Sequence, residues 1–467
     1  MNKKNYVAVA TLAFAMLTSC AGQKEAKSTS GIDLANMDTT VSAGTDFFRY
    51  ACGGWNDAHP LTAEYSRYGT FDELFENSQK QLRELIEGLA AQKNNQAGSA
   101  AQKIGDLYNM AMDSVTLNKQ GAEPVKAMLD KIAGLKDKSE IVPMMTEMAH
   151  IGIGTYFHSY VYADPKNSSL NIFQMGQGGI NLGEKEYYLD TDSITQNIRE
   201  QYKLYIGKLF QLAGFSEADA QQKVADVMEI ETAIAKVSRS ATELRDPEAN
   251  YHKMSFDELK KTIAGIDWDA YVKGLGIQAP AELNVEQVEP IQEVARLMNT
   301  LPLSKHVSYL EYNLLDAAAS CLSDDFVAAR FDFYGKVLSG RQVNQPRWKR
   351  AVNSVNGMLG ELVGEMYVEK YFPAAAKERM VKLVKNLQTA LGERIDAQEW
   401  MSDSTKIRAY EKLAAFHVKV GYPDKWKDYS KLEIKNDSYW ANVCRASEWG
   451  FNDMYSRIGK PVDKDEW

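Results

Sequence analysis

The sequence predicts a mainly α-helical fold, a large multi-helix domain with a small β-hairpin inserted into it. Apolar residues recur at the helical spacing i, i+3, i+4 and i+7 in many segments, as in the run from Leu82 to Leu89. Serines placed three residues before an acidic side chain, at Ser216 and Ser255, mark the starts of two helices. Only the stretch 151–177 changes to the alternating pattern of strands, which predicts one hairpin in a helical chain.

Length, composition and charge limit the classes of protein to which the chain can belong. The chain of 467 residues is long enough for one large domain or two to three ordinary ones, and its 45% of hydrophobic residues is typical of a globular protein. Lys and Arg number 54 against 63 Asp and Glu, and the net charge of -9 is spread without long runs of either sign. Nucleic-acid binding is therefore not predicted.

The first residues have the pattern of an export signal. Two lysines are followed by an apolar core, and Leu17-Thr18-Ser19-Cys20 closes the segment like a bacterial lipoprotein signal. We predict a signal peptide over 1–19, a lipid on Cys20 and a polar, flexible tether over 20–42. Acyl chains on Cys20 would anchor the protein in the cell envelope, as a periplasmic or outer-membrane lipoprotein. The alternative is an ordinary secretory signal with an incidental cysteine.

The stretch Asp46–Leu74 is the least generic part of the chain, DFFRYACGGWNDAHPLTAEYSRYGTFDEL. Aromatic residues such as Phe47, Phe48 and Trp55 crowd around the pair Gly53-Gly54. Because glycine tolerates tight backbone conformations and large rings favour burial, this composition predicts a turn held by buried rings.

Helical and extended segments then follow in order. A helix is expected over 82–89 and another around 104–111. In the hairpin, an alternating strand precedes a turn at Asp164–Asn167 and a second extended run. The last third is helical almost throughout, and one of its helices has an apolar face made of Met380, Leu383, Val384, Leu387 and Leu391.

Ordered motifs give the chain a family resemblance. Asp46–Trp55 matches the pattern D-F-[YF]-x-Y-x-[CN]-G-x-W, and Arg67–Leu74 matches R-[YF]-x-x-F-D-x-L. These patterns resemble the opening of the neprilysin-like zinc metallopeptidases, the M13 family. Further landmarks occur in the family order, namely 183–189, 333–335, 347–350, 364–368, 400–405, 421–426 and 461–467. The resemblance spans 43–467 and implies the helical N-terminal region of that family.

The resemblance implies roles for two residues. Arg67 stands where the family places an arginine that binds the C-terminal carboxylate of the substrate, and a guanidinium suits this because its planar fork donates two charge-assisted hydrogen bonds. Phe71 matches a position that lines the pocket for the residue just after the scissile bond. Some members carry a second arginine where this chain has Phe75, a departure that argues against tight dipeptidyl selectivity.

The catalytic motif of the family does not occur in the sequence. Zinc peptidases of this kind need H-E-x-x-H, with two histidines on one helical face and a glutamate as general base. No two of the six histidines lie three to five residues apart. The chain is expected to end before this motif, with no catalytic residue and no metal ligand of its own, so zinc is expected only in a full-length protein.

Other chemistries find little support. Glu147-x-x-His150 has a metal-ligand spacing, but a site in a helix bundle needs a second such motif, so an ordinary structural histidine is expected. Gly176-x-Gly178-Gly179 lacks the third glycine of a dinucleotide-binding loop and indicates a turn.

Cysteine pairing follows partly from the resemblance. Vertebrate members pair a cysteine at the position of Ala111 with one at the position of Ala351, so this bridge is missing here. The family partner of the Cys52 position lies beyond the end of this chain, and Cys52 is expected to be unpaired. The sequence leaves the pairing of Cys321 and Cys444 open.

These features predict the N-terminal, substrate-enclosing part of a lipid-anchored M13-type zinc endopeptidase that acts on oligopeptides. Its expected partners are peptide substrates, the membrane, and a C-terminal catalytic domain in cis or in trans. The alternative is a free-standing exported lipoprotein that serves as a peptide-binding or scaffold module. A large apolar surface left bare would favour the peptidase part, since a free-standing module should present a polar surface there.

Overall fold

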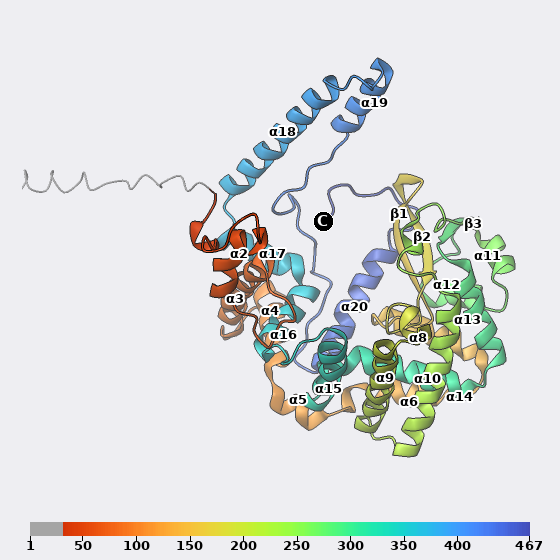
Figure 1. Ribbon diagram of the computed structural model, residues 1–467. Helices are drawn as coiled ribbons and strands as arrows, with labels where there is room; N and C mark the ends of the chain where they lie inside the picture. The colour runs from red at the N-terminus through yellow and green to blue at the C-terminus, as the bar shows by residue number, and fades with distance from the viewer. Residues whose placement is uncertain (1–30) are drawn as a thin grey trace, which may run out of the picture. The chain divides into compact units, whose positions relative to one another are not determined.

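The computed structural model describes residues 31–467 and divides into two units, one that ends at Thr62 and one that runs from Ala63 to Trp467 (Figure 1). Both are described separately below. The predicted signal peptide and the lipidation site Cys20 lie outside the described residues.

The first unit contains a 3-10 turn, η1 (Leu34–Asn36), and helix α2 (Phe47–Ala58). The turn predicted at Gly53-Gly54 is wrong, because both glycines lie inside α2. Phe47 and Phe48 are also not buried, since each is 68% exposed. The absence of a side chain at Gly54 lets the backbone of Ala35 approach the helix closely. A Cβ on Gly54 would lie 2.1 Å from the carbonyl oxygen of Ala35. The pair therefore lets the chain around η1 pack directly on the helix.

The second unit is mainly helical, as predicted. Helix α3 (Thr70–Ala90) packs against α4 (Ala100–Met112) and α16 (Arg347–Met358), while α10 (Glu217–Val237) packs against α9 (Ser193–Leu212), α13 (Val288–Thr300) and α14 (Leu303–Ala318). The other helices are α5 (Ser114–Gln120), α6 (Glu123–Ala133), α7 (Ile141–His150), α8 (Glu186–Leu189), α11 (Phe256–Thr262), α12 (Trp268–Gly274), α15 (Asp324–Arg330), α17 (Gly360–Tyr371), α18 (Ala374–Asp396), α19 (Asp403–Ala414) and α20 (Tyr439–Tyr455). Short turns complete the unit, namely η2 (Lys138–Glu140), η3 (Glu243–Arg245), η4 (Ala319–Cys321) and the π-helical η5 (Phe331–Leu338).

Local signals for the helices are confirmed. Ile86 on α3 and Ile104 and Leu107 on α4 are fully buried, as their spacing predicts. The side chains of Ser216 and Ser255 cap α10 and α11 by accepting hydrogen bonds from the backbone N–H groups three residues on. Sequence periodicity and capping thus determine where these helices begin and which face they bury.

The predicted hairpin is confirmed and belongs to a larger sheet. Strand β1 (Phe157–Asp164) pairs antiparallel with β2 (Asn167–Gln177), with Phe157 opposite Gln177. In the described chain the sheet has four strands in the order β1-β2-β4-β3. The added strands are β4 (Glu282–Val285), parallel to β2, and β3 (Lys253–Ser255), antiparallel to β4.

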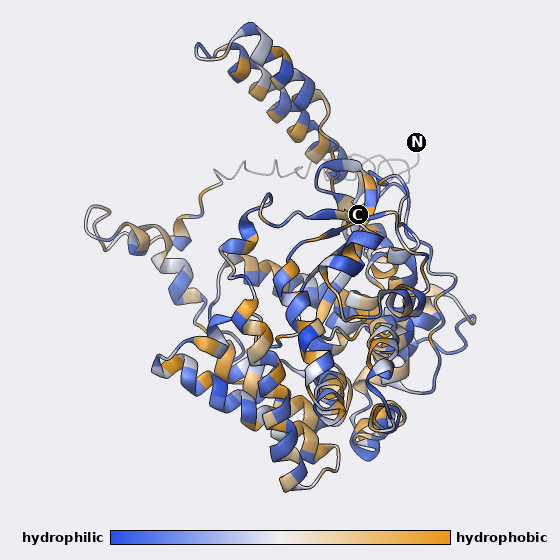
Figure 2. Ribbon diagram, turned by 90° about the vertical axis from the view of Figure 1, so that its right-hand side faces the viewer, coloured by the Kyte–Doolittle hydropathy of each residue, from blue (hydrophilic) through white to orange (hydrophobic). Residues whose placement is uncertain are grey.

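The helical hairpin of α18 and α19 carries an apolar face that the rest of the unit does not cover. Met380, Leu383, Leu387 and Leu391 on α18 are 43–61% exposed. Figure 2 shows hydrophobic residues recurring along this hairpin at the top of the view. The predicted amphipathic helix is therefore present, but its apolar side faces solvent in this chain.

Among residues 31–467, no helix combines the length and the low polarity that a membrane span requires.

Candidate functional site

Arg67 and Phe71 lie where the chain enters α3. Gly69 is the N-cap residue of α3, and its backbone N–H donates to Oδ2 of Asp72 at 2.9 Å. This cap fixes the first turn of the helix, which contains Phe71. The ring of Phe71 is 86% exposed, and Leu74 and Phe75 are 61% and 47% exposed. Since residues three and four apart share a helix face, these side chains form one apolar stripe, and it begins four residues after Arg67.

A buried lysine holds the segment that contains Arg67. Lys349 on α16 has an 8% exposed side chain, and its ammonium lies 2.8 Å from Oε2 of Glu64 and 2.6 Å from Oε1 of Glu76. The hydroxyl of Tyr65 also donates to Glu76. Glu64 precedes Arg67 in the chain and Glu76 follows it, and Lys349 binds both carboxylates to α16.

The electrostatics of this cluster favour its charged form. Burial lowers the pKa of Lys349, but the bonds to Glu64 and Glu76 outweigh it and raise this pKa overall. For Glu76, burial raises the pKa, and the bonds from Lys349 and Tyr65 outweigh it and lower the pKa overall. The ion pairs therefore stay formed near neutral pH.

Arg67 itself is exposed, and its guanidinium has no hydrogen bond or ion pair with any other residue of the described chain. The backbone around it is fixed while its donors remain available. This is the arrangement that recognition of a carboxylate requires, because a guanidinium already paired would first have to break that pair.

Zinc does not fit the residues of the described chain. Between residues 31 and 467, no three His, Cys, Asp or Glu side chains come together as a metal site. The spacing Glu147-x-x-His150 is used otherwise, since Nε2 of His150 lies 2.9 Å from the carbonyl oxygen of Gly274 and Lys131 donates to Glu147 at 2.6 Å. No step through a metal follows from these residues.

Comparison with known proteins identifies the family. The family model described as "Peptidase family M13" matches residues 43–423. The chain belongs to peptidase family M13. It is 28% identical over 459 residues to endothelin-converting enzyme 1 of Rattus norvegicus and to that of Homo sapiens, covering 93% of this chain. It spans 59% and 58% of those two relatives, which is less than two thirds of their length.

Solved structures agree with this M13 assignment. The inhibitor complex of the Mycobacterium tuberculosis zinc metalloprotease Zmp1 matches with a TM-score of 0.87 and 33% identity, over 94% of this chain and 66% of that one. PepO from Lactobacillus rhamnosis HN001 matches with a TM-score of 0.79 and 20% identity, over 89% of this chain and 66% of that one, which supports the fold alone. The expected M13 N-terminal fold is therefore confirmed.

The cysteines within residues 31–467 of this M13 chain are thiols. Cys52, Cys321 and Cys444 are all free. Burial raises the pKa of Cys321 to about 11 and that of Cys444 to about 12, so both are protonated and unreactive near neutral pH. Ala111 and Ala351, at the positions of the vertebrate cysteine pair, are buried and line one common cavity.

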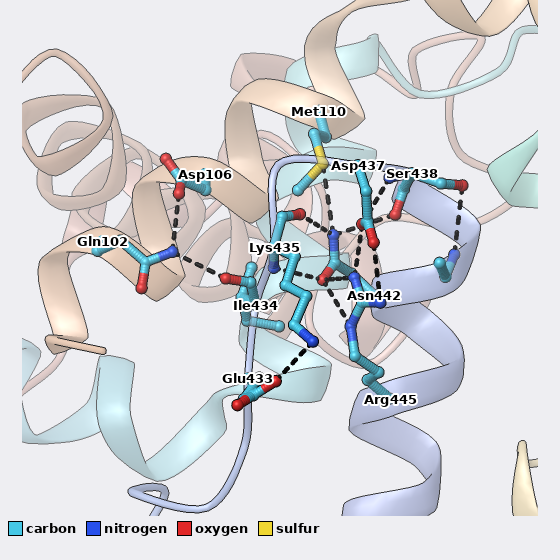
Figure 3. A network of polar contacts seen from close by, with 11 residues as sticks. Gln102, Asp106, Met110, Glu433, Ile434, Lys435, Asp437, Ser438, Asn442 and Arg445 are labelled. Atoms are coloured by element: carbon cyan, nitrogen blue, oxygen red, sulfur yellow. Dashed lines mark hydrogen bonds and ion pairs between the residues drawn. The ribbon is translucent and has the colours of Figure 1, made fainter. Parts of the chain in front are cut away.

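A polar network joins the C-terminal part of the M13 chain to α4 (Figure 3). Asn442, the buried residue at its centre, donates to the carbonyl oxygen of Lys435 at 2.7 Å and accepts from its N–H at 2.9 Å. Gln102 on α4 donates to the carbonyl oxygen of Ile434 at 2.9 Å and to Asp106 at 2.7 Å. Because the buried amide of Asn442 is bonded at both its oxygen and its nitrogen, the network acts as a structural clamp.

Proposed function

We propose that this chain is the N-terminal, substrate-enclosing part of an M13-type zinc endopeptidase that acts on oligopeptides. The observation that carries the proposal is that the unpaired guanidinium of Arg67 and the exposed ring of Phe71 lie four residues apart on a segment fixed by Lys349. The similarity to the zinc metalloprotease Zmp1 supports the same class of chemistry. The zinc ligands would come from a catalytic part, in cis or as a second chain.

The chemistry of each residue indicates its role in binding a peptide. Arg67 would bind the C-terminal carboxylate of a peptide through two charge-assisted hydrogen bonds. Phe71 would contact an apolar side chain next to the scissile bond, and Leu74 and Phe75 would extend this contact. The protein would be anchored in the cell envelope by lipid on Cys20, with peptides as substrates and without nucleic acid.

The apolar face of α18 favours this proposal over a free-standing module. Leu383 and Leu387 are 48% and 61% exposed, and a groove of about 370 Å³ lies between α18 and the chain after α19, next to Phe416 and Val418. Exposed apolar surface of this kind is typical of a face that another domain covers. We assign it to the zinc-binding part.

Arg67→Gln is expected to lower kcat/KM about 100-fold for a peptide with a free C-terminus, because it removes two charge-assisted hydrogen bonds. The assay uses the peptidase assembled from this chain and its zinc-binding part. The same peptide with an amidated C-terminus should be cleaved equally by both proteins. Arg408→Gln on α19, where the side chain is 80% exposed, is the matched control and should leave both rates unchanged. Equal losses on both peptides would contradict the role of Arg67.

Leu387→Asp is expected to weaken association with a separately added zinc-binding part at least about 10-fold, because it places a charge in an apolar contact. The chain alone should unfold at the same urea concentration as the wild type, since Leu387 is 61% exposed. Asn386→Asp, an exposed position beside it on α18, introduces the same charge and should not change the affinity. Unchanged binding by Leu387→Asp would show that another surface carries the association.

A further inference from the structure

A cavity of about 520 Å³ lies where α15, η5 and α16 meet, and it is strongly basic. Its lining includes Arg330, Arg341, Arg347 and Arg350, and no aspartate or glutamate. The rest is apolar or neutral polar. Four arginines therefore line one space whose own walls contain no carboxylate.

Two of the four arginines pair with carboxylates that are not part of the cavity lining. Arg330 donates to Oδ1 of Asp316 at 2.8 Å, and Arg347 pairs with Asp324. Arg347 also donates to the carbonyl oxygen of Ala111 at 3.1 Å. Their charges are thus offset within the chain.

Arg341 and Arg350 have no ion pair anywhere in residues 31–467. The guanidinium of Arg341 lies 5.6 Å from the ring centre of Phe331, and Nε of Arg350 donates to the carbonyl oxygen of Gln345 at 3.2 Å. A ring and a carbonyl group bind a cation weakly compared with a carboxylate. Arg341 therefore has no counter-charge beside it, and Arg350 has no ion pair of its own but shares the attraction of Asp324, the carboxylate that pairs with Arg347.

The surroundings increase the cost of these charges. Burial and the neighbouring Arg347 lower the pKa of Arg350, and they outweigh the opposite effect of Asp324. Like charges in a partly buried space repel one another, because water screens them poorly there. An anion in the cavity would remove this repulsion and would accept hydrogen bonds from the guanidinium forks.

The cavity also has room and neutral donors for such a ligand. Ala111 and Ala351 are small side chains at its wall, so they leave space between α4 and α16. Asn344 and Ser354 contribute an amide and a hydroxyl to the lining. Arg67 and Phe71 are not part of it, so this site differs from the proposed peptide site.

We propose that this cavity is an oxyanion site for a small ligand with at least two negative charges on phosphate or carboxylate groups. It goes beyond the peptidase function and does not depend on it. The ligand charges would lie between Arg341 and Arg350, and the alanine side of the cavity would contact its uncharged part.

Isothermal titration calorimetry on the full chain with sodium phosphate and with citrate, against sodium chloride of equal ionic strength, tests this site. Saturable binding of one phosphate or one citrate per chain, with a Kd below about 1 mM, is expected. The tighter probe identifies the group that the site prefers. No saturable heat with either probe would overturn the proposal.

Variants locate the binding. Arg341→Gln and Arg350→Gln should each weaken it at least about 10-fold, because each removes a positive charge that has no ion pair in the cavity. Arg408→Gln, which removes an exposed arginine on α19, should leave the affinity unchanged. If Arg350→Gln does not fold, Arg341→Gln remains decisive, since its side chain has only the ring contact described above. Wild-type affinity in Arg341→Gln would overturn the assignment.

Discussion

Lys349→Met is expected to lower the free energy of unfolding by about 3 kcal/mol, because it leaves two half-buried carboxylates without their cation. The lysine is 8% exposed and bonds Glu64 and Glu76, whose side chains are 28% and 16% exposed. Methionine fills a similar volume, so the loss reports the charge and not a cavity. Urea unfolding at pH 7 measures it.

Two further variants separate the ion pairs from simple loss of a lysine. Lys370→Met removes an exposed pair with Glu84, in which the side chains are 47% and 67% exposed, and should change stability little. Adding Glu64→Gln and Glu76→Gln to Lys349→Met should restore part of the loss, because the uncompensated charges disappear. If Lys349→Met unfolds at the same urea concentration as Lys370→Met, the cluster does not hold the Arg67 segment.

Local patterns predicted the helices well because helix formation depends on neighbours in sequence. The apolar spacing around Ile86 and Ile104 and the cap at Ser255 act within one or two turns. The same reasoning missed β3 and β4, since strands of three and four residues are too short to show a period. β4 pairs with β2, which lies more than a hundred residues earlier in the chain, and β3 pairs with β4.

Patterns that depend on distant contacts were misread or left open. Gly53-Gly54 indicated a turn, although the pair serves the approach of Ala35 to a helix, which no local signal contains. The spacing on α18 correctly predicted an amphipathic helix, but periodicity does not reveal what covers its apolar face.

The candidate site shows the same limit. Arg67 and Phe71 were found through a short motif, and their roles remain proposals. The partnership of Lys349 with Glu64 and Glu76 was missed, because it joins positions about 280 residues apart and opposite charges are common in any sequence. The sequence did not predict the arginine cavity for the same reason, since the residues that line it are spread from Ala111 to Tyr439.

Glu231 is the other group with a large expected effect, because it is a carboxyl with no exposed surface on α10. It accepts hydrogen bonds from Tyr188 at 2.7 Å, from Tyr202 at 2.9 Å and from Asn181 at 2.8 Å. Burial raises the pKa of Glu231 to about 7, although these hydrogen bonds act in the opposite direction. Burial also holds the pKa of both tyrosines well above the usual value, so they stay protonated donors.

The raised pKa means that the folded state binds a proton more tightly than the unfolded state. The contribution of Glu231 to stability is therefore fully present below pH 4.5 and is lost as pH rises through about 7. His306 has the opposite sign, since burial lowers its pKa to about 4, and its contribution is lost as pH falls from 6.5 through 4. Between pH 4.5 and 6.5 the two effects oppose each other in the wild type.

Glu231→Gln separates these effects, because an amide keeps the shape of the side chain and cannot titrate. The free energy of unfolding of the wild type minus that of Glu231→Gln should fall by about 2 kcal/mol between pH 5.5 and pH 8. The acid-side loss caused by His306 should remain in the variant. Urea unfolding followed by circular dichroism at several pH values measures both. A constant difference across this range would mean that Glu231 keeps an ordinary carboxyl pKa in the folded protein, and that its hydrogen bonds compensate fully for its burial.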